Sequence, residues 1–162
     1  RSWVVGRQSQ RTALVLQFSA GGQPFAESIV PGGEQKATLL FYPGAVQQRA
    51  RFLGRDGNVV AMSARPPGTA SIDSFLAGVA DQAARQPWLT SYGAVLHDVR
   101  LAPQGETWFV VDRDGRGLPL AGREHWKLLA LSGGHPFDIT AEWNGYALRS
   151  LGIYHANQFR VA

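Results

Sequence analysis

Three tripeptides constrain the fold of this chain more than any other feature of its sequence. Arg55-Asp56-Gly57, Arg113-Asp114-Gly115 and Trp143-Asn144-Gly145 each interrupt a run of apolar residues. Asp-Gly and Asn-Gly are the pairs that most readily adopt the positive φ angles of a two-residue turn, so each pair predicts a β-hairpin. We therefore expect a protein built largely from antiparallel hairpins.

The first third of the chain predicts an all-β subdomain. Its β-branched and aromatic residues favour strands over 3–6, 12–18 and 36–42, followed by a hairpin over 47–62 that turns at Asp56-Gly57. The consecutive prolines in Arg65-Pro66-Pro67-Gly68-Thr69 cannot continue a helix or a central strand. We expect an N-terminal β subdomain over 1–64 and a second subdomain over 65–162, with one continuous domain as the alternative.

Residues 71–86 predict one amphipathic helix. Ser71 suits the N-cap, Asp73 places a negative charge in the first turn, and Pro87 ends the helix. Apolar residues recur within it at spacings of three and four: Ile72, Phe75, Leu76, Val79, Ala80 and Ala83. Such a stripe must be buried, most simply against a sheet.

The remainder of the chain returns to strands. These are expected over 94–101, 107–112, 117–120, 139–143, 147–154 and 158–161, whereas 125–131 fits a short helix or a strand equally well. The fold class that we predict is α+β, mostly antiparallel β with hairpins and one helix packed on a sheet.

No arrangement of residues in the sequence predicts catalysis, a metal site or a cofactor. The chain has no cysteine, which excludes disulfides, thiolate nucleophiles and thiolate zinc sites. Its four histidines, His97, His125, His135 and His155, lie too far apart in sequence for a zinc-binding helix or finger. We expect a non-catalytic protein. An enzyme would require a pocket in which Asp112, His125, His135 or Glu142 converge.

The charge of the chain suggests anionic partners. Its net charge is +4, and arginine outnumbers lysine fourteen to two. Scattered arginines are typical of a solvated surface, but a basic surface also attracts nucleic acid or an acidic protein. The candidate binding residues are a basic stretch with an aromatic residue inside it: Arg113, Arg116, Arg123, Trp126 and Lys127. Trp126 also fits a core position, because Leu128, Leu129 and Leu131 follow it.

Two features of the sequence bear on its cellular context. The longest apolar runs are far shorter than the roughly 20 residues of a membrane-spanning helix, so we expect no membrane-spanning segment. The first residue is Arg1 rather than Met, and we expect the chain to be part of a larger protein.

Two stretches of the chain resemble a known family. One contains 3–9 and 13–16 with Phe41-Tyr42-Pro43-Gly44-Ala45, and the other contains 126–134 with Glu142-Trp143-Asn144-Gly145 and 148–151. Together they are similar to the region beyond the zinc finger in bacterial SWIM zinc-finger proteins. The finger's cysteine ligands are absent here, so no zinc ligand is carried over. The resemblance implies a cytoplasmic bacterial protein and a general association with nucleic-acid or protein binding.

These observations together predict a non-catalytic interaction or accessory domain of a larger bacterial protein. The alternative is a nucleic-acid-binding domain that uses an arginine-rich surface. No metal ion or cofactor is expected in either case.

Overall fold

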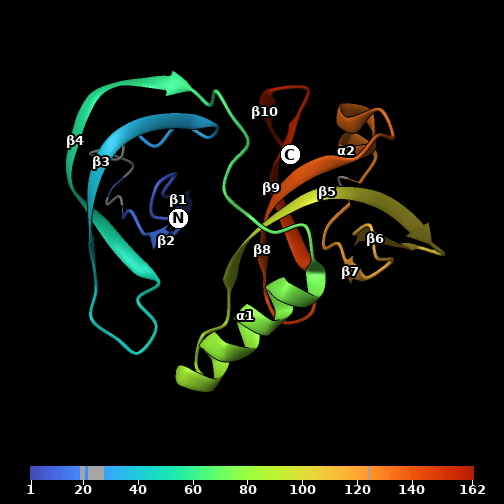
Figure 1. Cartoon of the computed structure of the whole chain (residues 1–162), viewed down its shortest axis with the longest axis horizontal. Coiled ribbons are helices and arrows are strands. Elements are labelled where there is room, and N and C mark those ends of the chain that lie inside the picture. The colour runs from blue at the N-terminus through green and yellow to red at the C-terminus, as the bar shows by residue number, and fades with distance from the viewer. Residues whose placement is uncertain (19–20, 22–27, 124) are drawn as a thin grey trace. The chain divides into compact units, whose positions relative to one another are not determined.

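The chain forms two compact units. A computed structural model describes residues 1–18, 21, 28–123 and 125–162. Unit 1 is Arg1–Met62 and unit 2 is Ser63–Ala162, so the division falls just before the proline-rich segment (Figure 1). Both units are mainly antiparallel β-structure, and the helices lie in unit 2. The predicted α+β class, mostly antiparallel β, is confirmed.

The described part of unit 1 holds a four-stranded sheet in the order β1-β2-β4-β3. Its strands are β1 (Ser2–Val5), β2 (Thr12–Val15), β3 (Gly33–Phe41) and β4 (Arg49–Ala61). Strands β2 and β4 pair in parallel, and the other pairs are antiparallel. Among the described residues of this unit, few apolar side chains are buried: Ala13, Leu14, Val15 and Ala50. Most side chains of β3 and β4 therefore remain at least partly exposed.

The hairpin predicted over 47–62 is wrong. Strand β4 runs through Asp56-Gly57 without a reversal and pairs along its length with β3. The register shifts between the pairs Lys36–Asp56 and Glu34–Val60, which marks a β-bulge at Gly57, where φ is 69°. One type of β-bulge places a glycine at positive φ, as a tight turn does, so the Asp-Gly pair fits either feature.

Unit 2 is organised around a six-stranded sheet in the order β10-β9-β8-β5-β6-β7. The strands are β5 (Tyr92–Gln104), β6 (Thr107–Val111), β7 (Gly117–Pro119), β8 (Phe137–Trp143), β9 (Leu148–His155) and β10 (Gln158–Val161). All neighbouring strands in it are antiparallel. Strand β5 is longer than predicted and reverses into β6 at Gly105-Glu106.

The other two predicted hairpins of the chain are present in unit 2. The Asp112 N–H donates to the Arg116 carbonyl at 2.9 Å, so three residues form the loop between β6 and β7, and Gly115 has φ of 80°. Between β8 and β9, Asn144 N–H donates to the Ala147 carbonyl at 3.3 Å. That turn is therefore centred on Gly145 and Tyr146, one residue later than the Asn-Gly pair indicates.

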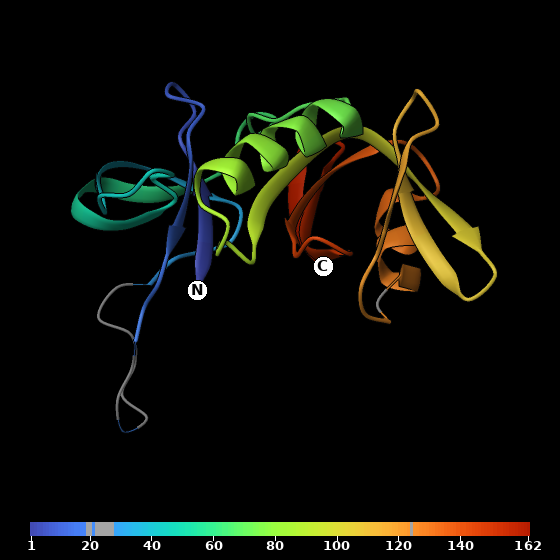
Figure 2. The ribbon, with the colours of Figure 1, turned by 90° about the horizontal axis from the view of Figure 1, so that it is seen from below.

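Two helices accompany the sheet. Helix α1 (Ile72–Arg85) is the predicted amphipathic helix, and the Ser71 hydroxyl accepts the Ser74 N–H at 3.2 Å as its N-cap. It packs along β5 (Figure 2). The segment that fitted a helix or a strand forms a second, short helix, α2 (His125–Ser132), which Gly133 and Gly134 end with positive φ angles.

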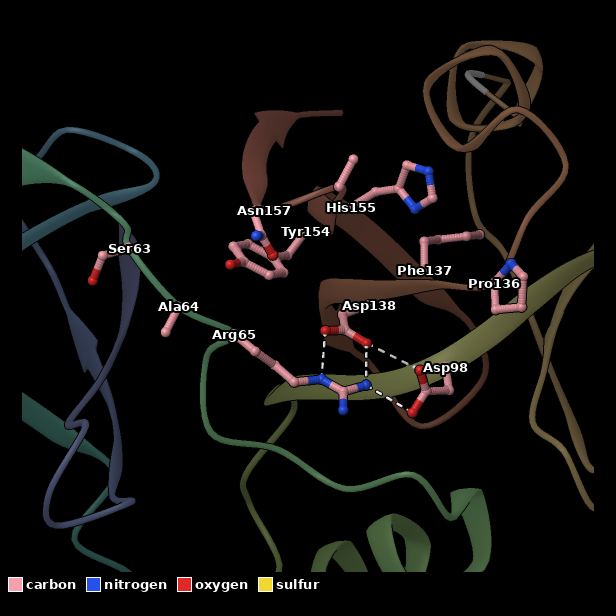
Figure 3. A pocket seen from close by; sticks show the side chains of 11 residues that line it. Ser63, Ala64, Arg65, Asp98, Pro136, Phe137, Asp138, Tyr154, His155 and Asn157 are labelled. Atoms are coloured by element: carbon pink, nitrogen blue, oxygen red, sulfur yellow. Dashed lines mark hydrogen bonds and ion pairs between the residues drawn. The ribbon is translucent and has the colours of Figure 1, made fainter.

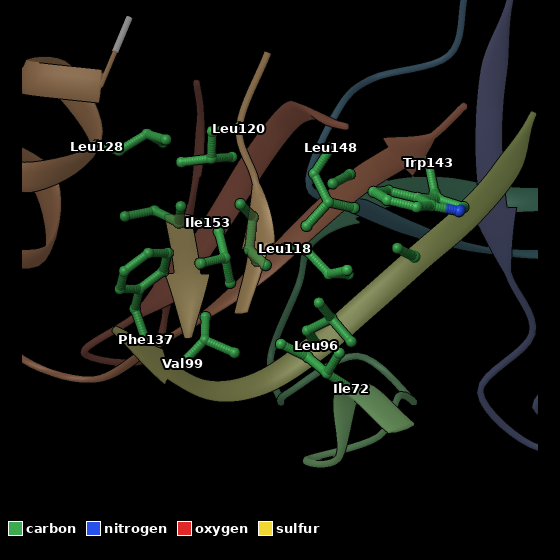
Figure 4. Close-up of a cluster of buried hydrophobic side chains, with 14 of the residues drawn as sticks. Ile72, Leu96, Val99, Leu118, Leu120, Leu128, Phe137, Trp143, Leu148 and Ile153 are labelled. Atoms are coloured by element: carbon green, nitrogen blue, oxygen red, sulfur yellow. The ribbon is translucent and has the colours of Figure 1, made fainter. Parts of the chain in front are cut away.

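The core of unit 2 lies on one face of its sheet. Ile72 of α1 packs there with the inward side chains of β5, β8 and β9 (Figure 4). A bulge between Leu96 and Val99 keeps both of these side chains in the core, although they are an odd number of residues apart. The same bulge places Asp98 on the opposite face of the sheet, with φ of 54°.

Candidate functional site

The structure separates the basic residues that the sequence grouped together. Arg116 lies after the end of β6, where its Nε is 3.0 Å from both carboxylate oxygens of Asp73 at the start of α1. Trp126 lies near the start of β6, with its ring 5.1 Å from that of Trp108 in an edge-on contact. The predicted set is therefore not one cluster, although Arg113, Arg123 and Lys127 are all exposed.

Trp126 is not a core residue. Its side chain is 70% exposed, whereas Leu128 of the same helix is buried in the core. Residues two positions apart in a helix point to different sides, so the burial of Leu128 turns Trp126 outward. Trp126 and His125 instead both contact Trp108, with the His125 ring stacked 5.8 Å from that of Trp108.

Asp112 is a buried structural carboxylate. Its Oδ2 accepts the Ile72 N–H at 2.9 Å, and its Oδ1 accepts the N–H groups of Asp114 at 3.0 Å and Arg116 at 2.9 Å. Burial alone would raise its pKa, but the three backbone donors outweigh this and lower the pKa below the ordinary value. Asp112 therefore joins the N-terminus of α1 to the β6–β7 loop.

The four residues that an enzyme would have to bring together lie in different places. His125 contacts Trp108, His135 stacks 6.5 Å from His155, and Glu142 on β8 faces Arg149 on β9 at 3.5 Å. Asp112 is committed to backbone donors at the start of α1. Each of the four side chains therefore has a different neighbour.

The net charge of the chain resides in unit 1. Residues 1–62 contain seven lysines and arginines and three acidic residues, whereas residues 63–162 contain nine of each. Residues 37–55, which cover most of β3 and β4, contain three arginines and no acidic residue. The excess positive charge, which favours attraction of anions, therefore lies in unit 1, whereas the unit that contains the predicted stretch is balanced.

One side of the β3–β4 pair combines exposed arginines with exposed apolar side chains. Leu40 pairs with Arg51, and the Tyr42 N–H donates to the Arg49 carbonyl at 2.9 Å, so the four side chains share one face. All four are exposed, and the Arg49 guanidinium lies 5.8 Å from the centre of the Tyr42 ring. We call Leu40, Tyr42, Arg49 and Arg51 the Arg–Tyr face.

Further arginine–aromatic pairs lie on unit 1. The Arg11 guanidinium lies 3.8 Å from the centre of the Phe41 ring, and that of Arg55 lies 5.0 Å from the Phe52 ring. Each distance is within the range of a cation–π contact. The sequence analysis did not predict these pairs. The stretch 37–55, which contains arginines and aromatic residues but no acidic residue, could have indicated a basic surface with exposed rings.

A second candidate site is an open hollow in unit 2, on the sheet face opposite the core. Its volume is about 390 Å³, and Figure 3 shows Arg65, Asp98 and Asp138 at its centre. Arg65 holds Asp138 with two hydrogen bonds, from Nε at 2.8 Å and Nη2 at 2.7 Å, and Nη2 also donates to Asp98 at 2.7 Å. These bonds raise the pKa of Arg65 above its ordinary range, and the bonds to Asp138 contribute more than the bond to Asp98. It therefore stays charged.

The rim of this hollow is made by backbone in uncommon conformations. Four non-glycine residues of the described chain have positive φ, and three of them line the hollow: Asp98 at 54°, Ala156 at 49° and Asn157 at 59°. Ala156 and Asn157 form the turn between β9 and β10, because His155 pairs with Gln158. Such angles are uncommon outside glycine and are held here by the surrounding sheet.

Comparisons with known proteins identify no relative. No family model, no curated protein and no solved structure matches this chain. The resemblance to the SWIM family stays a prediction. Among the described residues, no group of three or more metal-ligating side chains could hold a metal ion. In that same part of the chain, no helix has the length and apolar character needed to cross a membrane.

Proposed function

We propose that this chain is a non-catalytic binding module that associates with single-stranded nucleic acid through the Arg–Tyr face of unit 1. The observation that supports it best is the composition of that face, where Arg49 and Arg51 lie beside Leu40 and Tyr42 within a stretch, residues 37–55, that contains no acidic residue. Arginines contact phosphates, while an exposed aromatic ring stacks on a base. The accessory role in a larger protein that the sequence predicts is compatible with this proposal.

The strand-built surface of unit 1 favours a single strand over a duplex. The described part of unit 1 contains strands and no helix that would enter a major groove. A sheet surface with an exposed ring instead suits unstacked bases, whose faces are available for stacking. The 50% exposure of Tyr42 leaves room for such a base beside Arg49.

The test is fluorescence anisotropy with a labelled single-stranded 20-mer over a range of salt concentrations. Replacing both Arg49 and Arg51 with alanine removes two phosphate contacts, so the slope of log K against log salt should fall by about 1.4. Tyr42→Ala removes stacking, worth about 1–3 kcal/mol per base, and should weaken binding without changing the slope. Circular dichroism and urea unfolding confirm that each variant is folded.

A matched control uses the surface that the sequence singled out. Replacing Arg113 and Arg123 in unit 2 with alanine changes the net charge equally and should leave affinity nearly unchanged. Equal losses from both double variants would show that binding follows net charge and not the Arg–Tyr face. Competition by polyglutamate as effective as that by unlabelled oligonucleotide would point to an acidic protein and overturn the proposal.

A further inference from the structure

The hollow in unit 2 contains polar groups that its own structure leaves without partners. Asp98, Asp138 and Tyr154 form a row across β5, β8 and β9, because Asp98 N–H donates to Asp138 Oδ1 at 3.0 Å and Asp138 is in register with Tyr154. Tyr154 is more than nine-tenths buried. Its hydroxyl lines the hollow, and no hydrogen bond joins it to the other side chains drawn there (Figure 3).

The balance of charge in the hollow favours a cation. Two carboxylates, Asp98 and Asp138, face one guanidinium, that of Arg65. Asp138 is buried and its two oxygens already accept three hydrogen bonds. Asp98 is different, because its side chain is 59% exposed and only Oδ2 contacts Arg65. The other oxygen of Asp98 remains as an acceptor at the rim.

At the other end of the row, the protein side chains are uncharged and could hydrogen-bond a neutral polar group of a ligand. The Tyr154 hydroxyl and the Asn157 carboxamide both line the hollow there. Neighbouring strands are about 4.8 Å apart, so the backbone positions of Asp98 and Tyr154 lie roughly 10 Å apart across three strands. An extended side chain with a cationic end and an amide at its base matches that span.

We propose that this hollow binds an arginine-like ligand, with its guanidinium on Asp98 and its amide against Tyr154 and Asn157. The bonds to Arg65 show that these carboxylates accept guanidinium geometry. Planar, forked donors are the groups that a carboxylate recognises best. The ligand is either a free arginine derivative or an arginine side chain of a partner, and the chemistry of recognition is the same for both.

The experiment is an NMR titration of the full chain with arginine amide, and in a second arm with the peptide Gly-Gly-Arg-Gly-Gly amide. Citrulline amide, in which an uncharged urea replaces the guanidinium of arginine amide and the α-ammonium group is kept, is the control ligand. We expect saturable shifts at Asp98, Tyr154 and Asn157 with both arginine probes and none with citrulline amide. Tighter binding of the peptide identifies a partner side chain as the natural ligand, and tighter binding of the free amide identifies a small molecule.

Two variants test the assignment of atoms. Asp98→Asn keeps a side chain that tolerates positive φ and should weaken binding by at least about tenfold, because a charge-assisted bond is lost. Tyr154→Phe removes only the hydroxyl and should weaken binding roughly three- to tenfold. Glu106→Gln, an exposed change in the β5–β6 turn, should have no effect. Absence of saturable shifts with either arginine probe, or equal shifts with citrulline amide, overturns the proposal.

Discussion

Replacing Asp112 with asparagine should destabilise unit 2 by about 3 kcal/mol at pH 7. Asparagine retains one acceptor oxygen, which can serve the N–H groups of Asp114 and Arg116 as Oδ1 does now. Its NH₂ group then faces the N–H of Ile72, whose side chain is buried, and that donor loses its partner. A buried unpaired donor costs about 1–3 kcal/mol, and loss of charge weakens the remaining bonds and the interaction with the helix dipole.

The pH dependence of this difference identifies its origin. The folded-state pKa of Asp112 is lowered, so its contribution is fully present above the unfolded-state value of about 3.9 and is lost as pH falls through the folded pKa. Because the variant does not titrate at this position, the gap in unfolding free energy between wild type and variant should be constant above about pH 5 and should shrink below about pH 3.9.

The assay is urea unfolding followed by tryptophan fluorescence at several pH values. Asp114→Asn is the matched control, because it makes the same chemical change on an exposed side chain of the same loop. That control should cost less than about 0.5 kcal/mol. A loss from Asp112→Asn no larger than the control's, or a gap that stays constant down to pH 2, would refute the reasoning.

Two further substitutions should stabilise the protein. Ser150→Ala should raise the unfolding free energy by about 1 kcal/mol, measured by urea unfolding, because the Ser150 hydroxyl is buried without a partner and alanine removes that cost; an unchanged or lower midpoint contradicts this. Ala156→Asn should increase the free energy of unfolding by roughly 0.5–1 kcal/mol and so raise the thermal midpoint, since asparagine tolerates the φ of 49° better than alanine. A lower midpoint would show that the turn is not strained.

Turn chemistry was readable from the sequence where the flanking strands pair with each other. The Asp114-Gly115 and Asn144-Gly145 pairs lie between such strands, and both hairpins are confirmed. The Asp56-Gly57 pair has the same local chemistry, but β4 finds its partner in β3 across a longer connection. Local residues specify positive φ, whereas the choice between a turn and a bulge depends on which strand lies alongside.

Helix α2 shows a different limit of sequence reasoning. Its eight residues are too few for a clear periodicity, so 125–131 fitted a helix or a strand. The Gly133-Gly134 pair is a helix-ending signal, and both residues do adopt positive φ. The exposure of Trp126 could not be predicted from the sequence, because it depends on the orientation of the helix that buries Leu128 in the core.

The candidate sites differ in how far the sequence could reveal them. The Arg–Tyr face lies on two neighbouring strands and within an acid-free stretch, so charge counting over residues 37–55 would have indicated it. Arg65 is 33 positions from Asp98 and 73 from Asp138, and only the pairing of β5 with β8 brings these carboxylates together. No local spacing encodes such a site.

The distribution of charge and burial suggests that the units divide their tasks. Unit 2 has balanced charge, a core of fifteen buried residues and the buried carboxylates Asp112 and Asp138, so its structure accounts for most of the stabilising burial. The described residues of unit 1 bury little apolar surface, and the unit carries excess positive charge, whose self-repulsion opposes its compact state. A bound polyanion would relieve that repulsion and stabilise the folded form by mass action. A cation in the hollow of unit 2 would not relieve that repulsion. The proposal for the hollow and the proposal for the Arg–Tyr face can therefore be tested independently of each other.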